Sequence, residues 1–331
     1  MSLPSQSSRT QKSTSVIPRK KTTALPKDLL TVADISRDTI HHLITLAQKM
    51  KAARRQGRAT FPLKGKTLGL IFEKPSTRTR VSFEAGMNQL GGQAIFLASE
   101  KIQLSRGESL ADTAKVLTRY LDGLVVRTFN QASLEEWAKH TSIPVINGLT
   151  DDCHPCQALA DLLTIVEHRG HAKDLKLAYI GDGNNITHSL VEIGAKVGMH
   201  VIVGCPKGYE PDPRIVEAAQ IEGQQTGARI EITHDPKIAA TDADVIYTDV
   251  WISMGQEHEQ QPRISALTPY QVNSQLMKQA KPNALVMHCL PAHRGEEITE
   301  EVLDGPQSVV LDQAENRLHI QKAILLEWLG R

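Results

Sequence analysis

Short apolar runs alternate with segments of helical periodicity along most of this chain. In the first half, runs of three to five residues are separated by stretches whose apolar side chains recur every three or four positions. This alternation is the βαβ rhythm of a parallel sheet covered on both faces by helices. The expected strands are residues 68–72, 94–97, 124–127 and 145–147, and the expected helices between them are residues 79–90, 110–120 and 134–140.

The same rhythm resumes after an apolar helix that we predict at residues 158–167. A helix that joins two doubly wound halves is a natural domain boundary, and 331 residues suffice for two cores. We therefore predict the α/β class with two parallel-sheet domains. The expected strands of the second series are residues 175–181, 201–205, 228–233, 243–251, 283–289 and 308–313. The expected units are a tail (1–24), a first domain (25–157), a second domain (158–314) and a C-terminal helix packing back on the first (315–331).

Charge is almost balanced over the chain, at +1, but it is unevenly placed. Residues 1–27 hold six basic residues and no acidic one, so the remainder carries 32 basic against 37 acidic residues. That remainder has no electrostatic reason to bind nucleic acid or an anionic membrane, and any anion must be held by a local cluster. We find no apolar run of membrane-spanning length and no secretory signal, and we expect a soluble, cytoplasmic protein.

The first 24 residues are rich in Ser, Thr, Lys and Arg and poor in apolar side chains. Such a composition cannot bury much surface, so we expect a loose tail. A mitochondrial presequence shares this composition, but it should also form an amphipathic helix, for which large apolar residues are too few. The mitochondrial matrix is kept as the less favoured alternative.

Two of the four cysteines, Cys153 and Cys156, form a CxxC pattern in the segment DDCHPCQ. Four cysteines in a chain of this length do not indicate a disulfide framework. A structural zinc site needs a second pair of ligands at similar spacing, and none follows. A thioredoxin-like redox site needs only one pair at the start of a helix and remains a second hypothesis.

The segment FEKPSTRTR leaves an expected strand and enters an expected helix. Ser76 and Thr77 can cap the helix, whose free N–H groups, together with Arg78 and Arg80, form a site suited to phosphate. The alternative is a capped helix with exposed arginines. Because ligands bind beyond the carboxyl ends of parallel strands, we favour the phosphate site.

Other polar residues at strand ends are ambiguous one by one. The segment GDGNN lacks the third glycine and the later acidic residue of a dinucleotide fold, so its asparagines either cap a helix or contact a polar substrate. Asp249 ends an apolar strand, where it forms either a buried salt bridge or part of a site. Cys289 could be an inert buried thiol, and His154 could be a satisfied structural histidine.

Taken together, four motifs resemble the signatures of the ornithine carbamoyltransferase family. They occur in the family's order and spacing, and the resemblance runs from about Leu25 to the C-terminus. The first two are shared with aspartate carbamoyltransferases and imply only carbamoyl phosphate, while the last two imply ornithine. The motifs are Ser76-Thr77-Arg78-Thr79-Arg80, His154-Pro155-Cys156-Gln157, Asp249 with Ser253-Met254-Gly255, and His288-Cys289-Leu290-Pro291.

The resemblance implies a role for each matching residue. Arg127, His154, Asp249 and Cys289 are implied as catalytic residues, and Gln103 as part of a loop that reaches a neighbouring subunit's site. The implied carbamoyl phosphate ligands are Ser76, Thr77, Arg78, Thr79, Gln103, Arg127, His154, Gln157, Cys289, Leu290 and Arg317. The implied ornithine ligands are Asn185, Asp249, Ser253 and Met254.

The implied reaction transfers the carbamoyl group of carbamoyl phosphate to the δ-amine of ornithine, giving citrulline and phosphate. The resemblance implies no metal and no cofactor, a homotrimer or a multiple of trimers, and a place in arginine biosynthesis. A carboxylate at Asp249 suits the α-ammonium of ornithine and repels aspartate. Putrescine or another amine is the alternative acceptor, and the catabolic direction would use the same residues.

Overall fold

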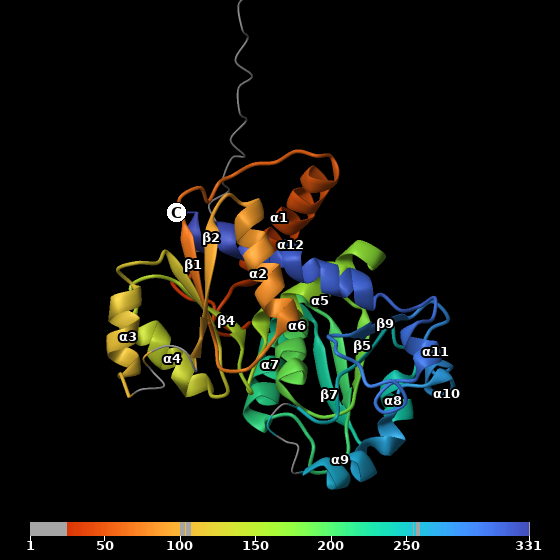
Figure 1. Cartoon of the computed structure of the whole chain (residues 1–331). Coiled ribbons are helices and arrows are strands. Elements are labelled where there is room, and N and C mark those ends of the chain that lie inside the picture. Colours follow the sequence, from red (N-terminus) through yellow and green to blue (C-terminus); the bar gives the residue numbers. More distant parts are fainter. Residues whose placement is uncertain (1–24, 100–102, 104–106, 254, 256–258, 331) are drawn as a thin grey trace, which may run out of the picture.

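The computed structural model describes residues 25–99, 103, 107–253, 255 and 259–330. Their helices and strands form two layered α/β units, each with its own sheet (Figure 1). All strand pairs within both sheets are parallel, which confirms the predicted fold class. Met254 and the N-terminal tail (1–24) lie outside the described residues.

The first sheet has the strand order β2-β1-β3-β4. Its two central strands are almost fully buried, as expected where helices cover both faces. Its strands are β1 (Thr67–Phe72), β2 (Gln93–Ala98), β3 (Gly123–Arg127) and β4 (Val145–Leu149). The helices after β1, β2 and β3 are α2 (Thr77–Gln89), α3 (Leu110–Leu117) and α4 (Gln131–His140).

The second sheet has the strand order β7-β6-β5-β8-β9. From β5 the chain adds β6 and β7 on one side and then returns to add β8 and β9 on the other side, so the strand order reverses beside β5. Such a switch point opens a crevice beyond the carboxyl ends of the strands. The strands are β5 (Lys176–Ile180), β6 (His200–Gly204), β7 (Arg229–Thr233), β8 (Val245–Thr248) and β9 (Leu285–His288). The helices are α6 (Asn185–Val197), α7 (Pro213–Thr226), α8 (Pro236–Ala240), α9 (Gln260–Leu267), α10 (Ser274–Met277) and α11 (Glu300–Leu303), with a 3-10 turn at Thr268–Tyr270.

Two long helices connect the two sheets, and a third packs against both of them. The helix α5 (Pro155–Arg169) starts with a proline, ends at Gly170 in the left-handed region, and is buried along its first eleven residues. The C-terminal helix α12 (Val310–Leu329) packs against α5, α2 and α1 (Arg37–Arg55). Figure 1 shows α12, in blue, running past α1 and α2 and over α5. One continuous apolar core therefore includes residues from both sheets.

One expected strand is wrong. Residues 308–313 were expected to form a strand, but only Ser308 makes an isolated bridge, to Val286, and α12 begins at Val310. A three-residue apolar run does not distinguish a strand from the start of a buried helix. Here Val310 is buried while Leu311 is exposed, as on one face of a helix, so the C-terminal helix is longer than expected.

No helix among the described residues is both long enough and apolar enough to cross a lipid bilayer.

Candidate active site

Strand ends from both sheets meet around one cavity of about 1300 Å³. Thirteen of the fifteen predicted site residues line it; Gln103 does not, and Met254 lies outside the described residues. We call one side the cationic half, formed by Ser76, Thr77, Arg78, Thr79, Arg127, His154, Gln157, Leu290 and Arg317. We call the other side the acidic half, formed by Asn184, Asn185, Asp249, Ser253 and Cys289.

The start of α2 forms the floor of the cationic half. Ser76 is the N-cap: its hydroxyl accepts from the backbone N–H of Thr79 at 3.2 Å and donates to the Thr79 hydroxyl at 3.0 Å. The first turn of the helix therefore presents free N–H groups and its positive dipole end to the cavity. The sequence between β1 and α2 has formed a capped helix terminus that can bind an anion.

Three guanidinium groups surround that helix terminus. Arg317, which is 3% exposed, donates to Gln157 Oε1 at 2.6 Å and to the Thr79 hydroxyl at 3.1 Å, and Arg78 donates to the carbonyl oxygen of Leu290. Burial, followed by the charges of Arg317 and Arg78, lowers the pKa of Arg127 to about 10. A pKa of about 10 leaves Arg127 charged at neutral pH, and three converging guanidinium groups can hold an anion.

Arg80 was also expected to add charge here, but its side chain leaves the cavity. It pairs with Glu84 at 2.9 Å and lies over the Phe96 ring at 3.8 Å from the ring centroid. The two arginines are two positions apart on a helix, so they point in different directions. The phosphate interpretation of this segment therefore rests on Arg78.

His154 ends in the cavity with an unused ring nitrogen. The residue is 4% exposed, and its Nδ1 has no hydrogen-bond partner among the described residues. Burial, followed by the charges of Arg317, Arg127 and Arg78, lowers the pKa of His154 well below its ordinary value, so the ring is neutral. Nε of Arg127 is likewise buried and unpaired. Both residues line the cavity, so these two nitrogen atoms are available to a ligand there.

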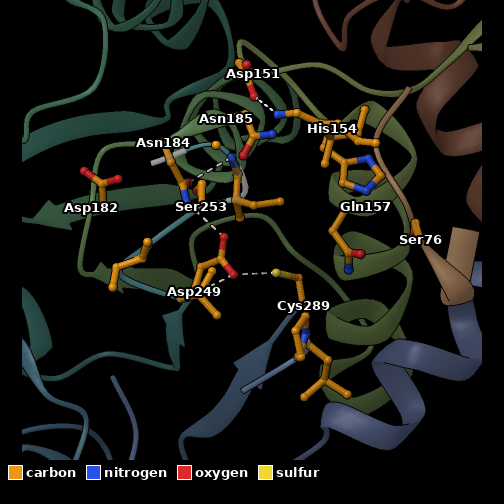
Figure 2. A pocket seen from close by; sticks show the side chains of 18 of the residues that line it. Ser76, Asp151, His154, Gln157, Asp182, Asn184, Asn185, Asp249, Ser253 and Cys289 are labelled. Carbon is orange, nitrogen blue, oxygen red and sulfur yellow. Dashed lines mark hydrogen bonds and ion pairs between the residues drawn. The ribbon is translucent and has the colours of Figure 1, made fainter. Parts of the chain in front are cut away.

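Asp249 and Cys289 form the centre of the acidic half (Figure 2). The Cys289 thiol donates to Asp249 Oδ1 at 2.9 Å, and Asn184 donates to Asp249 Oδ2 at 2.9 Å. Burial, and then the Asp249 carboxylate, raise the pKa of Cys289 well above its ordinary value, so the thiol stays protonated. No ion pair joins Asp249 to any described residue, which argues against the buried salt bridge as its role.

The sequence left open whether the two asparagines of GDGNN cap a helix or contact a polar substrate, and the structure places them differently. Asn184 caps α6, because its Oδ1 accepts from the N–H groups of Ile186 at 3.0 Å and Thr187 at 3.3 Å. Asn185 donates to the Thr150 carbonyl at 2.6 Å and lines the cavity. Figure 2 shows Asn185 and Ser253 on the side of the cavity that Asp249 occupies.

A buried histidine holds Leu290 in place at the boundary between the halves. His288 Nδ1 accepts from the Leu290 N–H at 2.9 Å, and Nε2 therefore donates to Glu297 Oε1 at 3.0 Å. Leu290 itself lies in the left-handed region, at φ 59°. Asp249, His288 and Cys289 have ligand atoms within 4.8 Å of one another, but both ring nitrogens of His288 are already used. This cluster is therefore a poor metal site.

The CxxC cysteines do not have the properties of a redox pair. Cys153 and Cys156 are both free thiols and both buried. Burial raises the pKa of each thiol to about 12, whereas a reactive cysteine needs a lowered pKa. Of this segment, His154 and Gln157 line the cavity, and the two cysteines do not.

Two residues at the site were not predicted from the sequence. Lys74 is 3% exposed, lines the cavity, pairs with Asp151 and lies 4.3 Å from the Phe129 ring centroid. Its place in the strand-end segment FEKPSTRTR was a usable signal. Asp161 lies one helical turn after Gln157, and its carboxylate accepts a hydrogen bond from the Gln157 side-chain amide. The i, i+4 spacing could have indicated this contact.

Comparison with known proteins places the chain. The family model for the carbamoyl-P binding domain of aspartate/ornithine carbamoyltransferases matches residues 27–167, and the model for the Asp/Orn binding domain matches residues 173–328. The ornithine carbamoyltransferase of Oceanobacillus iheyensis is 58% identical over 299 residues, 90% of this chain and 93% of that relative. That of Anoxybacillus flavithermus is 56% identical over 303 residues, 92% of this chain and 96% of the relative.

A solved ornithine carbamoyltransferase from Pyrococcus furiosus superposes with a TM-score of 0.90 at 51% identity, covering 92% of this chain and 97% of that one. The two family models together span nearly all the described residues, and they divide the chain between the same two sheets. The chain belongs to the aspartate/ornithine carbamoyltransferase family.

Proposed function

We propose that this chain is an ornithine carbamoyltransferase, which transfers the carbamoyl group of carbamoyl phosphate to the δ-amine of L-ornithine. The observation that carries the proposal is one cavity with three guanidinium groups around a helix terminus on one side and Asp249 with Cys289 on the other. The first arrangement suits a phosphate group, and the second suits an amine-bearing substrate. The similarity to relatives named ornithine carbamoyltransferase supports ornithine as the acceptor.

We further propose a division of labour between the domains. Residues 25–157 supply the carbamoyl phosphate site and residues 158–314 the ornithine site, while Arg317 returns from the last helix to the phosphate. Ser76, Thr77, Arg78 and Thr79 hold the phosphate; Arg127, His154 and Gln157 contact the carbamoyl group; Asn185, Asp249, Ser253 and Met254 hold ornithine. The proposed domain boundary falls inside α5, whose first turn faces the cavity.

The chemistry requires a neutral amine. An amine with an ordinary pKa of about 10 must lose a proton before attack. The protonated Cys289 thiol adds no negative charge beside the amine, and Arg78, Arg127 and Arg317 disfavour a second cation near the reacting carbon. Asp249 has no ion-pair partner among the described residues and can pair with the protonated α-ammonium of ornithine.

The bond changes then use the cationic half. The amine nitrogen attacks the carbamoyl carbon, and negative charge develops on the carbamoyl oxygen, where Arg127 and the Thr79 hydroxyl can donate. The neutral His154 ring offers one further N–H. The bond from carbon to the phosphate oxygen breaks, the departing phosphate takes the proton from the nitrogen, and its charge stays within the α2 terminus and the arginines.

Assembly and setting complete the proposal. Gln103 is exposed and lies outside this chain's own cavity, as expected for a residue that enters a neighbouring site in a homotrimer or a larger assembly of trimers. We place the enzyme in the cytoplasm and in arginine biosynthesis, in the direction of citrulline synthesis.

Formation of the N-carbamoyl product by the purified protein, which is citrulline when the amine is ornithine, tests the activity. Ornithine, putrescine, aspartate and N-acetylornithine are each supplied with carbamoyl phosphate. Strong turnover with ornithine alone is expected, because only ornithine offers both the δ-amine and the α-ammonium for Asp249. Preferred turnover of putrescine would keep the carbamoyl phosphate site and overturn the role of Asp249; no turnover with any amine would overturn the proposal.

A further inference from the structure

Asp161 is a buried carboxylate that lies behind the cavity and does not line it. It is 1% exposed and has no ion-pair partner among the described residues. Its Oδ1 accepts from Gln157 Nε2 at 2.8 Å and from Gln313 Nε2 at 2.8 Å, and its Oδ2 accepts from the Tyr247 hydroxyl at 3.0 Å. These three donors come from α5, α12 and β8, so one side chain connects elements of both domains.

The contact with Gln157 fixes which end of that amide faces the site. Gln157 Nε2 points at the Asp161 carboxylate, and Gln157 Oε1 accepts from Arg317 at 2.6 Å. The reverse orientation would place an oxygen against the carboxylate and an NH₂ group against a guanidinium. Asp161 therefore presents Gln157 to the cavity as an acceptor, which matches the NH₂ group of carbamoyl phosphate.

The other two contacts lead to the acidic half. Tyr247 lies two residues before Asp249 on the same chain segment, and its hydroxyl accepts from Gln313 at 3.1 Å while it donates to Asp161. Gln313 Oε1 in turn accepts from the backbone N–H of His288, the residue before Cys289. The ends of β8 and β9 are thus both tied to the same carboxylate.

We propose that Asp161 is a positioning residue for the transfer reaction, fixing Gln157 as an acceptor for the carbamoyl NH₂ group and holding the strand ends that carry Asp249 and Cys289. It acts through other side chains and touches neither substrate. The inference rests on the proposed function, because it assigns the Gln157 oxygen to the carbamoyl group. Nothing in the four sequence motifs assigns Asp161 a role.

A purely stabilising role fits Asp161 poorly. Burial raises the pKa of the Asp161 carboxyl to about 7, against the opposing effect of the hydrogen bonds from Gln157, Gln313 and Tyr247 and of the nearby Arg317 charge. A carboxyl whose pKa is raised on folding contributes its stability at low pH and loses it as the pH rises through about 7. At pH 8 the ionised group therefore costs folding free energy, and replacing it by an amide should not lower the melting temperature.

The contacts of Asp161 form two arms: the first is the hydrogen bond from Gln157, and the second is the hydrogen bond from Tyr247. The variants Asp161→Ala and Asp161→Asn separate them. Alanine removes every acceptor, so only Arg317 still holds the Gln157 amide. We expect calorimetric binding of carbamoyl phosphate to weaken about tenfold, roughly the value of one hydrogen bond, while binding of inorganic phosphate stays unchanged. Asparagine keeps one acceptor for Gln157 and should restore the carbamoyl phosphate affinity.

Asparagine also presents an NH₂ group toward Tyr247, so the second arm stays broken. Asp161→Asn and Tyr247→Phe should therefore share one defect, a roughly fivefold loss in kcat/KM for ornithine, at the wild-type melting temperature at pH 8. Asp312→Asn, an exposed aspartate beside Gln313 in sequence, is the matched control and should behave as wild type. If alanine prevents folding, asparagine and Tyr247→Phe carry the test.

Two results would overturn the proposal. One is kinetic and binding constants for Asp161→Asn and Tyr247→Phe within twofold of the control. The other is an equal loss of carbamoyl phosphate and inorganic phosphate affinity in a folded Asp161→Ala variant, since that would place the effect in the phosphate cradle. The binding ratio needs no acceptor amine, so it is decided even if the wild type does not carbamoylate ornithine.

Discussion

The cationic and acidic halves of the cavity differ in how their key groups are held. In the cationic half, Arg317 is buried and donates hydrogen bonds to Gln157 of α5 and Thr79 of α2. Ser76 caps α2. In the acidic half, Asp249 and Ser253 follow the end of β8, and Asn184 and Cys289 supply the side chains that hold the Asp249 carboxylate. Arg317 and the Ser76 cap thus belong to helices, whereas Asp249 and Ser253 follow the end of a strand.

This difference suggests how one fold can bind the same phosphate-bearing substrate while its specificity for the acceptor amine varies. A phosphate needs several converging positive groups, and these come from rigid elements that pack into the common core. In the proposed function a single carboxylate, Asp249, directly after β8, pairs with the acceptor, and we expect its replacement to leave the core intact. The two halves should therefore respond differently to substitution.

The largest effect is expected for Arg78→Ala. This change removes a charge from the α2 terminus and the contact with the Leu290 carbonyl, which lies at the boundary between the halves. We expect kcat/KM for carbamoyl phosphate to fall about 10³-fold in steady-state assays. Arg80→Ala, on the same helix but turned toward Glu84, is the matched control. Near-normal saturation by carbamoyl phosphate in Arg78→Ala would refute the cationic half as a phosphate site.

Asp249→Asn is expected to have the next largest effect and to be confined to the acidic half. The charge that pairs with the α-ammonium is lost, so kcat/KM for ornithine should fall about 100-fold. Calorimetric binding of carbamoyl phosphate should match that of Asp312→Asn. A comparable loss of carbamoyl phosphate binding would show that the two halves are not separable in this way.

Alkylation of Cys289 sharpens the view of the acidic half. Because burial and Asp249 raise the pKa of this thiol, its reaction with iodoacetamide at pH 8 should be at least about tenfold slower than that of an ordinary free thiol. Peptide mapping after timed labelling measures the rate, and urea-unfolded protein, in which all four cysteines react, is the reference. Rapid labelling of Cys289 in the folded protein would mean that the thiolate, not the thiol, faces Asp249.

The smallest effect is expected for Cys153→Ser, which lies in neither half. Cys153 is 3% exposed and its sulfur accepts from Asn147 Nδ2 at 3.3 Å, a contact that a serine hydroxyl can replace. Activity with ornithine should stay within about twofold of wild type, since no loss of a buried partner is expected. Loss of turnover in a folded Cys153→Ser protein would revive the redox hypothesis.

Local patterns predicted the first sheet better than the ends of the second. The run that ends at Phe72 is short and strongly apolar, and the segment that follows it is strongly polar and begins a capped helix. This contrast predicted the strand, the turn and the start of the helix. Residues 308–313 misled because three apolar residues fit both a strand and a helix. The packing that decides the case, α12 against α5, brings together residues about 150 positions apart.

The same distinction applies to the site. Residues in motifs, such as Arg78 and His154, could be predicted because their neighbours in sequence share the task. Lys74 escaped notice because a single lysine at a strand end is common on protein surfaces, and only the structure shows it buried. Asp161, Tyr247 and Gln313 are tied together by hydrogen bonds between distant elements, which no local pattern encodes.

The position of Arg317 on α12 has a consequence for how the protein is made. Every other residue of the cationic half precedes it in the sequence, and α12 packs against α1, α2 and α5. During synthesis the N-terminal sheet can fold first, but it emerges from the ribosome with the surface that α12 will cover still open. The nascent chain therefore cannot hold carbamoyl phosphate as the finished protein does, and a chaperone would meet this uncovered surface until translation of α12 is complete.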